Sequence, residues 1–175
     1  MVRYALMVIS PEMWRDEEYL EPKILFEDAH ILVKTASVDC GPVFSKTGMR
    51  AIAEDTVSDA NPDDYEAVVF VGGPGASVFF DDPAAHKLAN SMHDAGKVVA
   101  AICIASSTLA HAGLLKGRNA TAFESQKDDL VAHGANFTGN PVEIDGRIVT
   151  ANGPEAATAF GEAILGLLND TVQGE

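Results

Sequence analysis

The sequence Gly96-Lys97-Val98-Val99-Ala100-Ala101-Ile102-Cys103-Ile104-Ala105 decides the fold. Residues 98–102 form a short apolar run with no polar alternation, which is typical of a strand buried on both faces. A helical pattern over residues 104–112 follows at once, so Cys103 falls on a sharp strand-to-helix turn of the kind that exposes a nucleophile in hydrolases. Ligands bind at the carboxyl ends of strands in open α/β sheets. Cys103 is therefore the candidate nucleophile.

The chemistry of Cys103 depends on its surroundings. A helix N-terminus favours the thiolate, so we expect the pKa of Cys103 to fall below the usual value of about 8.5. The alternative is a small core residue, because free cysteine is among the most buried residue types. Position alone leaves both roles open. The second cysteine of the chain, Cys40, offers only one possible pair, and we expect two free thiols.

Apolar runs and helical stripes alternate on both sides of this stretch. The patterns predict strands at residues 4–9, 31–38, 67–71 and 98–102, helices at 16–29, 83–95, 104–112, 128–133 and 154–168, and a hairpin of residues 142–144 and 147–150. Residues 41–55 have a weaker β pattern and are expected to form a peripheral excursion. This alternation predicts an α/β fold with a mainly parallel sheet that helices cover on both faces.

Composition limits the classes of function. At 175 residues the chain suits one domain, residues 1–175. No apolar run approaches the roughly 18 residues of a membrane helix, and the start of the chain lacks a signal-peptide cleavage pattern, so we expect a cytoplasmic protein. The net charge of −14 repels phosphate backbones, which argues against nucleic acid and for a small-molecule partner. The acidic excess indicates a solvated surface and also suits a salty cytoplasm.

Several segments, in order along nearly the whole chain, resemble the ThiJ/PfpI family of the class I glutamine-amidotransferase-like superfamily, which includes a parkinsonism-associated deglycase branch and a protease-like branch. The segments are Glu18-Tyr19-Leu20-Glu21-Pro22, Val69-Phe70-Val71-Gly72-Gly73, residues 99–103, residues 109–118, Lys127-Asp128-Asp129-Leu130, residues 142–146 and Gly153-Pro154. The resemblance implies a flavodoxin-like three-layer sandwich with a nucleophile elbow after a central strand. It also implies a homodimer that needs no cofactor.

The resemblance assigns a role to Glu18. In the family pattern Glu18 would lie beside Cys103 and hydrogen-bond to the sulfur. Burial next to a thiolate raises a carboxyl pKa, so Glu18 would be a protonated donor and a general acid or base. Taken alone, Glu18 is one acid in the charged run of residues 16–21, and such runs are usually solvated.

Two glycines and one amide complete the implied site. Gly72 and Gly73 allow close backbone approach, and the amides of Gly73 and Ile104 would resemble an oxyanion hole beside the sulfur. The alternative for the double glycine is a simple tight turn after a strand.

Several positions depart from the family pattern, among them Ser106 in place of a Gly-Pro and Val71 in place of a proline, and three bear on catalysis. Ile104 stands where the protease-like branch has a histidine after the cysteine, and Phe123 matches the position of a loop histidine in the deglycase-like branch. Asn152 replaces an arginine before Gly-Pro. The resemblance therefore assigns no standard general base to this chain. The histidines lie in or beside predicted helices, where surface roles are expected, and none has metal-ligand spacing with another histidine or a cysteine. We expect no metal.

These observations give two functional hypotheses. The resemblance implies a cysteine-dependent enzyme, glyoxalase-like or deglycase-like, in which Cys103 attacks small electrophiles such as reactive carbonyls or their adducts while Glu18 moves a proton. The alternative is a redox-responsive stress protein whose Cys103 oxidises to a sulfinate without efficient catalysis. The expected partner is accordingly a small-molecule substrate or an oxidant. Peptidase activity is not expected, because Ile104 replaces the base.

Overall fold

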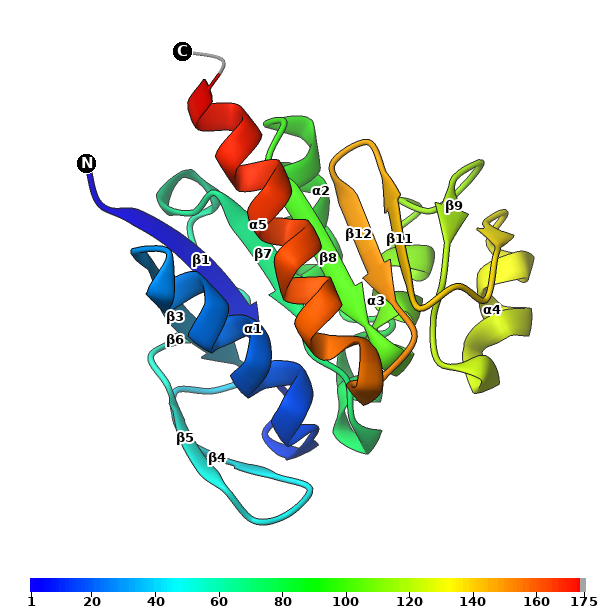
Figure 1. The fold of residues 1–175 in the computed structure, drawn as a ribbon. Helices are drawn as coiled ribbons and strands as arrows, with labels where there is room; N and C mark the ends of the chain where they lie inside the picture. Colours follow the sequence, from blue (N-terminus) through cyan, green and yellow to red (C-terminus); the bar gives the residue numbers. More distant parts are fainter. Residues whose placement is uncertain (174–175) are drawn as a thin grey trace.

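The computed structural model of the chain describes residues 1–173, and a seven-stranded sheet lies at its centre (Figure 1). The strand order is β11-β12-β8-β7-β1-β3-β6, and every neighbouring pair is parallel except β11 with β12. The strands are β1 (Arg3–Val8), β3 (Ile31–Ser37), β6 (Asp55–Thr56), β7 (Ala67–Phe70), β8 (Val98–Ile102), β11 (Val142–Asp145) and β12 (Ile148–Ala151). The predicted mainly parallel sheet is confirmed.

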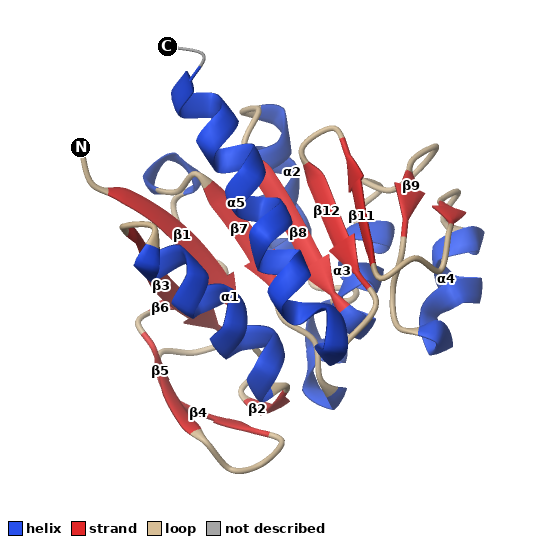
Figure 2. Cartoon of the chain, viewed as in Figure 1, coloured by secondary structure: helices blue, strands red, loops and turns tan. Residues whose placement is uncertain are grey.

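Helices cover both faces of this sheet (Figure 2). On one face, α1 (Asp16–Asp28) packs beside α5 (Ala157–Gln173). On the other face lie α2 (Pro83–Asp94) and α3 (Ser106–His111), and α4 (Lys127–Ala132) packs against α3. This is the predicted flavodoxin-like three-layer sandwich. No helix within residues 1–173 is long and apolar enough to cross a membrane.

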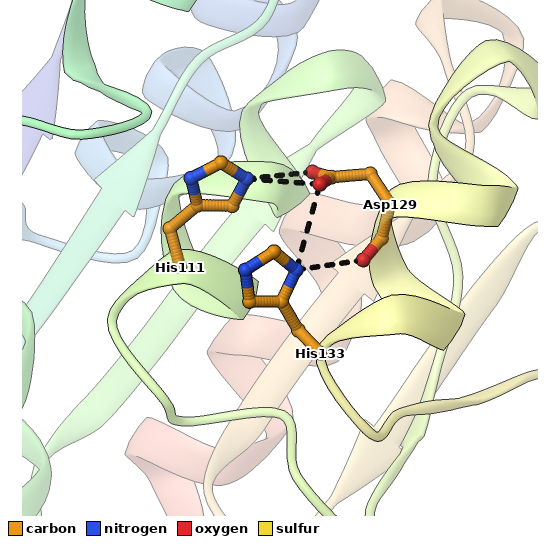
Figure 3. A group of neighbouring side chains, drawn as sticks. All are labelled: His111, Asp129 and His133. Atoms are coloured by element: carbon orange, nitrogen blue, oxygen red, sulfur yellow. Dashed lines mark hydrogen bonds and ion pairs between the residues drawn. The ribbon is translucent and has the colours of Figure 1, made fainter.

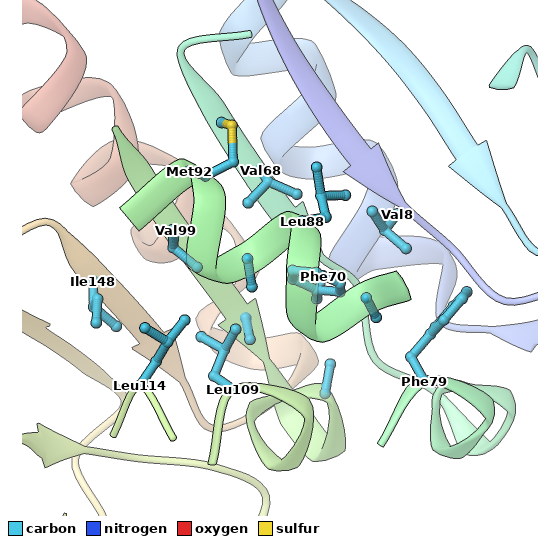
Figure 4. Packing of buried hydrophobic residues seen from close by; sticks show 14 of the residues in the cluster. Val8, Val68, Phe70, Phe79, Leu88, Met92, Val99, Leu109, Leu114 and Ile148 are labelled. Carbon is cyan, nitrogen blue, oxygen red and sulfur yellow. The ribbon is translucent and has the colours of Figure 1, made fainter. Parts of the chain in front are cut away.

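The core is divided by the sheet into two layers of side chains. Successive residues of a strand point to opposite faces, so Leu6 and Val8 join the cluster beneath α2 and α3, while Ala5 and Met7 join the cluster beneath α1 and α5. Figure 4 shows the first cluster, with Val8 among the side chains beneath α2. Strands β7, β8 and β12 are buried along their whole length, which explains their continuous apolar sequence.

Several short elements lie outside the central sheet. The expected peripheral excursion is a three-stranded sheet of β2 (Glu12–Trp14), β4 (Gly41–Ser45) and β5 (Arg50–Ala53), and β9 (Asn119–Ala120) pairs with β10 (Asn136–Phe137). The helix predicted for residues 104–112 begins as a 3₁₀ turn at Cys103–Ala105, and its α-helical part is only six residues long. Further 3₁₀ turns occur at Pro62–Asp64, Pro74–Phe79, Glu124–Gln126 and Pro154–Ala156.

Helix α1 is held against α5 by a glycine. A Cβ at Gly161 would lie 2.8 Å from Leu25 Cδ1 and 3.0 Å from Pro22 Cα, so only glycine allows the two helices to approach this closely. The contact fixes α1 over the sheet. Since Glu18 lies in the same helix, this packing also fixes the position of its carboxyl group.

Candidate active site

Cys103 lies directly after the carboxyl end of β8, on the predicted strand-to-helix turn. Its φ angle is +63°, which is uncommon for a residue other than glycine and costs conformational energy. The buried strand before it and the 3₁₀ turn and α3 after it hold the residue in this conformation. The side chain is 8% exposed, so the sulfur is nearly covered. The strained turn is the geometry of a nucleophile elbow.

Glu18 lies in the first turn of α1 and is 0% exposed, so it is not part of a solvated charged run. Its carboxyl group meets Cys103 at Gly72. A Cβ at Gly72 would lie 2.5 Å from Glu18 Oε1 and 2.6 Å from Cys103 Cβ. Glycine is therefore required at this position, and its absent side chain is what allows the carboxyl and the thiol to come together.

Burial raises the pKa of the Glu18 carboxyl to about 7, although the neighbouring Cys103 thiol and the charge of Arg15 oppose the rise. Burial also raises the pKa of the Cys103 thiol, to about 12, and the negative charge of Glu18 adds to the effect. The amides of Ile104 and Gly73 donate to the sulfur and lower the thiol pKa, but they do not offset burial. Our expectation of a lowered Cys103 pKa is therefore wrong.

The main physical reason is burial of the thiol, and the neighbouring carboxyl of Glu18 adds to it, while the short helical segment after Cys103 supplies little opposing helix dipole. The helix that follows Cys103 is a 3₁₀ turn and six α-helical residues, whereas the carboxyl of Glu18 is in direct contact. Cys103 and Glu18 therefore titrate as a pair, in which the loss of one proton makes the loss of the second much harder. Near neutral pH the pair carries at most one negative charge. When that charge is on sulfur, the pair presents a nucleophile beside a protonated acid.

Gly73 must be a glycine because its backbone has a positive φ angle and because neighbouring backbone atoms leave no room for a Cβ. Its φ angle is +102°, and a Cβ would lie within 3 Å of the backbone of Met13, Trp14 and Arg15. The Arg15 amide donates to Gly72 O over 3.0 Å, which ties the double-glycine turn to the start of α1. The turn is thus tight, and it also directs the Gly73 amide at the sulfur.

Arg15 is a site residue that the sequence analysis missed. Its guanidinium favours the ionised forms of both Glu18 and Cys103, and its Nε donates to Glu17 over 2.8 Å. Arg15 immediately precedes α1, the helix that carries Glu18. The only indication in the sequence was a single arginine directly before the acidic residues 16–18, and this pattern does not distinguish a site residue from a member of a surface ion pair.

A pocket of about 330 Å³ includes a residue that is hydrogen-bonded to the elbow, although Cys103 itself does not line the pocket. Its lining residues are Ala122, Phe123, Glu124, Gly139, Asn152, Gly153, Pro154 and Glu155. The Phe123 amide donates to Cys103 O over 3.2 Å, so the pocket wall is bonded to the elbow. Phe123 and Asn152, the two positions that depart from the family pattern in this region, line the same pocket. The described residues that line it include no histidine.

Among the described residues, those around Cys103 do not form a cluster that could hold a metal ion. The described residues contain one cluster that could hold a metal ion, His111, Asp129 and His133, and it lies between α3 and α4. The site around Cys103 offers thiol, carboxyl and amide chemistry instead.

Comparisons with known proteins agree with the pattern read from the sequence. A profile of the DJ-1/PfpI family matches residues 3–167. An uncharacterized protein of Methanocaldococcus jannaschii is 37% identical over 164 residues, which cover 92% of this chain and 80% of that protein. Deglycase PfpI of Pyrococcus furiosus is 28% identical over 163 residues, which cover 93% of this chain and 98% of that protein. The crystal structure of a ThiJ/PfpI domain protein from Brachyspira murdochii is 34% identical and matches with a TM-score of 0.93, covering 95% of this chain and 96% of that one.

Proposed function

This chain belongs to the DJ-1/PfpI family, and we propose that it is a cysteine-dependent enzyme that acts on small electrophiles such as reactive carbonyls or their adducts. The observation that carries the proposal is the fully buried carboxyl of Glu18 in contact with the thiol of Cys103. Relatives that are named deglycases add support for this substrate class.

The proposed reaction begins with the charge of the pair on sulfur. The Cys103 thiolate attacks the carbonyl carbon, a C–S bond forms, and the π electrons of the C=O bond move to oxygen. Glu18 gives its proton to that oxygen, so the product is a neutral hemithioacetal and Glu18 is left as a carboxylate. The amides of Gly73 and Ile104 stabilise negative charge in the same place, first on sulfur and then on the oxygen beside it.

The pocket whose wall is bonded to Cys103 through the Phe123 amide favours a small substrate. Its volume of about 330 Å³ is at the lower end of the range of ligand sites, about 300–1,000 Å³. Phe123 supplies an apolar wall, and Glu124 and Glu155 place negative charge on the lining. These features favour a small, uncharged carbonyl compound over an anion.

Turnover should be slow, and this is the reason for a second candidate function. A positioned general base typically contributes about 10²–10⁴-fold, and Phe123 and Ile104 occupy the two positions where the family has a histidine. The same pair suits a redox sensor. One peroxide would oxidise the thiolate to a sulfenic acid and be reduced to water, and a second would give the sulfinate, which the Glu18 proton and the two amides could stabilise. Fast peptidase activity is not part of either function.

The test measures consumption of methylglyoxal and glyoxal by the purified protein. We expect Cys103→Ser to abolish consumption, while Cys40→Ser, which changes an exposed thiol, retains it. Glu18→Leu should also lose activity. Consumption that persists in Cys103→Ser would disprove a cysteine-dependent enzyme. Mass spectrometry after graded peroxide decides the second candidate: sulfinate at Cys103 without any carbonyl turnover would favour the sensor.

A further inference from the structure

Three side chains with metal-binding chemistry meet where α3 packs against α4 (Figure 3). His111 is the last residue of α3, Asp129 lies in α4, and His133 follows four residues later at the end of that helix. His111 Nε2 lies 2.9 and 3.0 Å from the two carboxylate oxygens of Asp129, and His133 Nδ1 lies 3.4 Å from Asp129 Oδ1. One ligand atom from each side chain lies within 4.8 Å of the others.

We propose that His111, Asp129 and His133 form a binding site for a divalent first-row transition-metal ion such as Zn²⁺. Two imidazole nitrogens and one carboxylate are ligands that these ions accept, and the remaining coordination positions are open to water. Bonds of about 2.0–2.2 Å to a tetrahedral ion place the ligand atoms about 3.4 Å apart. The spacings on Asp129 fall within a few tenths of an ångström of that value. The two imidazole nitrogens lie within 4.8 Å of each other, so side-chain movements of about an ångström would complete the geometry for an ion.

A fourth residue supports the assignment. Asp81 Oδ1 lies 2.6 Å from His111 Nδ1, on the side of the ring away from Asp129. Metal-bound histidines commonly donate their other ring N–H to a carboxylate, which fixes the tautomer and makes the ligating nitrogen more basic. Here Asp81 binds Nδ1 of His111, and the other ring nitrogen, Nε2, faces Asp129 and is the ligand atom of the proposed site. A carboxylate, an imidazole and the proposed ion position thus follow one another in the order found in zinc proteins.

Without an ion the same residues form a hydrogen-bonded ion-pair network. Although burial lowers the pKa of His111, its hydrogen bonds to Asp81 and Asp129 raise that pKa above its usual value. His133 Nδ1 donates to Asp129 O over 2.8 Å, and the two imidazole rings stack with centroids 4.4 Å apart. Metal binding would displace the proton from His111 Nε2 and the backbone hydrogen bond of His133 Nδ1. The net charge of −14 favours the uptake of a cation.

The position of the site suggests a structural role. His111 follows Cys103 by eight positions, about 12 Å along a helix axis at 1.5 Å per residue and more where the first turn is 3₁₀, so the ion would not touch the reacting atoms. It would instead join the end of α3 to α4. An ion that binds only the folded chain stabilises that state by mass action. The metal would thus be a clamp between two short helices rather than a cofactor of Cys103.

The test uses the whole chain of residues 1–175 with Cys40→Ser and Cys103→Ser, so that no thiol can supply a ligand. After treatment with a chelator, calorimetric titration with Zn²⁺ should give one ion per chain. The variants Asp129→Asn and His133→Gln should lose most of the affinity, and Asp81→Asn should lose about 10–100-fold although it removes no ligand. The control His93→Gln changes a histidine near the end of α2 and should bind Zn²⁺ normally.

Thermal unfolding separates loss of the site from loss of the fold. Each variant without metal should still unfold cooperatively, and Zn²⁺ should raise the Tm of the parent and of His93→Gln but not of His133→Gln. Mg²⁺ at equal concentration is the control for non-specific screening of the acidic surface. It should not produce a larger rise in Tm in the parent than in His133→Gln. Equal Zn²⁺ affinity in the parent and in His133→Gln, or no binding by the parent, would overturn the proposal.

Discussion

Replacing Glu18 with glutamine should remove a pH dependence of stability that burial of the carboxyl creates. The pKa of Glu18 rises from 4.5 to about 7 on folding, so the folded protein holds this proton more tightly than the unfolded chain does. The stabilisation is fully present below about pH 4.5 and is lost as the pH rises through about 7. Ionised Glu18 therefore destabilises the folded state, and the neutral amide does not.

The size of the effect follows from the pKa change. A change of one in pKa corresponds to about 1.36 kcal/mol, so the rise in the pKa of Glu18 from 4.5 to about 7 amounts to about 3 kcal/mol. No discount for solvent screening is needed, because Glu18 is 0% exposed. The thiol of Cys103 contributes outside this window, since its pKa is raised to about 12.

The assay is urea unfolding of the parent and Glu18→Gln between about pH 5 and pH 8. We expect a variant that is more stable by about 1 kcal/mol at the low end and by about 3 kcal/mol at the high end. His111 also has a raised pKa and adds a slope of the same sign, but this slope is common to both proteins and cancels in their difference. Glu21→Gln, on the same helix, is the control. A constant difference across the range would refute the reasoning.

Three further predictions concern the site and the surface. Glu18→Gln should lower the pKa of Cys103, because it removes the adjacent carboxylate charge. Thiolate absorbance measured against pH, with Cys103→Ser as the blank, tests this, and an unchanged titration would contradict it. Gly72→Ala should destabilise the fold by about 1–3 kcal/mol and abolish carbonyl turnover, because its Cβ would meet Glu18 and Cys103; Gly166→Ala, with nothing within 4 Å, should be neutral or stabilising in the same denaturation assay. Potassium chloride should raise the Tm by screening the net charge of −14, and a Tm independent of salt would mean that repulsion at the surface is unimportant.

The main elements were predictable because their sequence periodicity reflects complete burial. Strand β8 was predicted at its observed bounds, since every residue from Val98 to Ile102 is buried and none is polar. The short strand β2 was not predicted. It contains only three residues, of which Trp14 alone is buried, so it has no periodicity to detect. The local pattern of apolar residues indicates which strands are buried in the sheet. Short elements that are held in place mainly by neighbouring elements have no such pattern.

The candidate site shows the same division between local and spatial information. The turn at Cys103 could be located from the adjacent strand and helix, but the direction of its pKa shift could not, because it depends on a carboxyl from α1 and on the depth of burial. The sequence spacing of His111, Asp129 and His133 does not indicate a metal site, for a similar reason. His111 is eighteen residues before Asp129 in the chain and meets it only through the packing of α3 on α4.

The function of the site depends on which atom carries the single charge of the Cys103–Glu18 pair. If the charge is on the carboxylate, the thiol is inert and the protein has neither a nucleophile nor an acid. If it is on sulfur, the pair holds both. The amides of Gly73 and Ile104 act on sulfur alone, whereas the charge of Arg15 favours ionisation of either group. Reaction with a carbonyl carbon or a peroxide consumes the thiolate form and draws the pair toward it, so weak resting reactivity is compatible with either proposed function. The rate of each reaction, measured in the parent and in Glu18→Gln, then separates them. Carbonyl turnover needs a transferable proton and should fall in the variant, whereas the first oxidation of sulfur needs only a thiolate and should become faster.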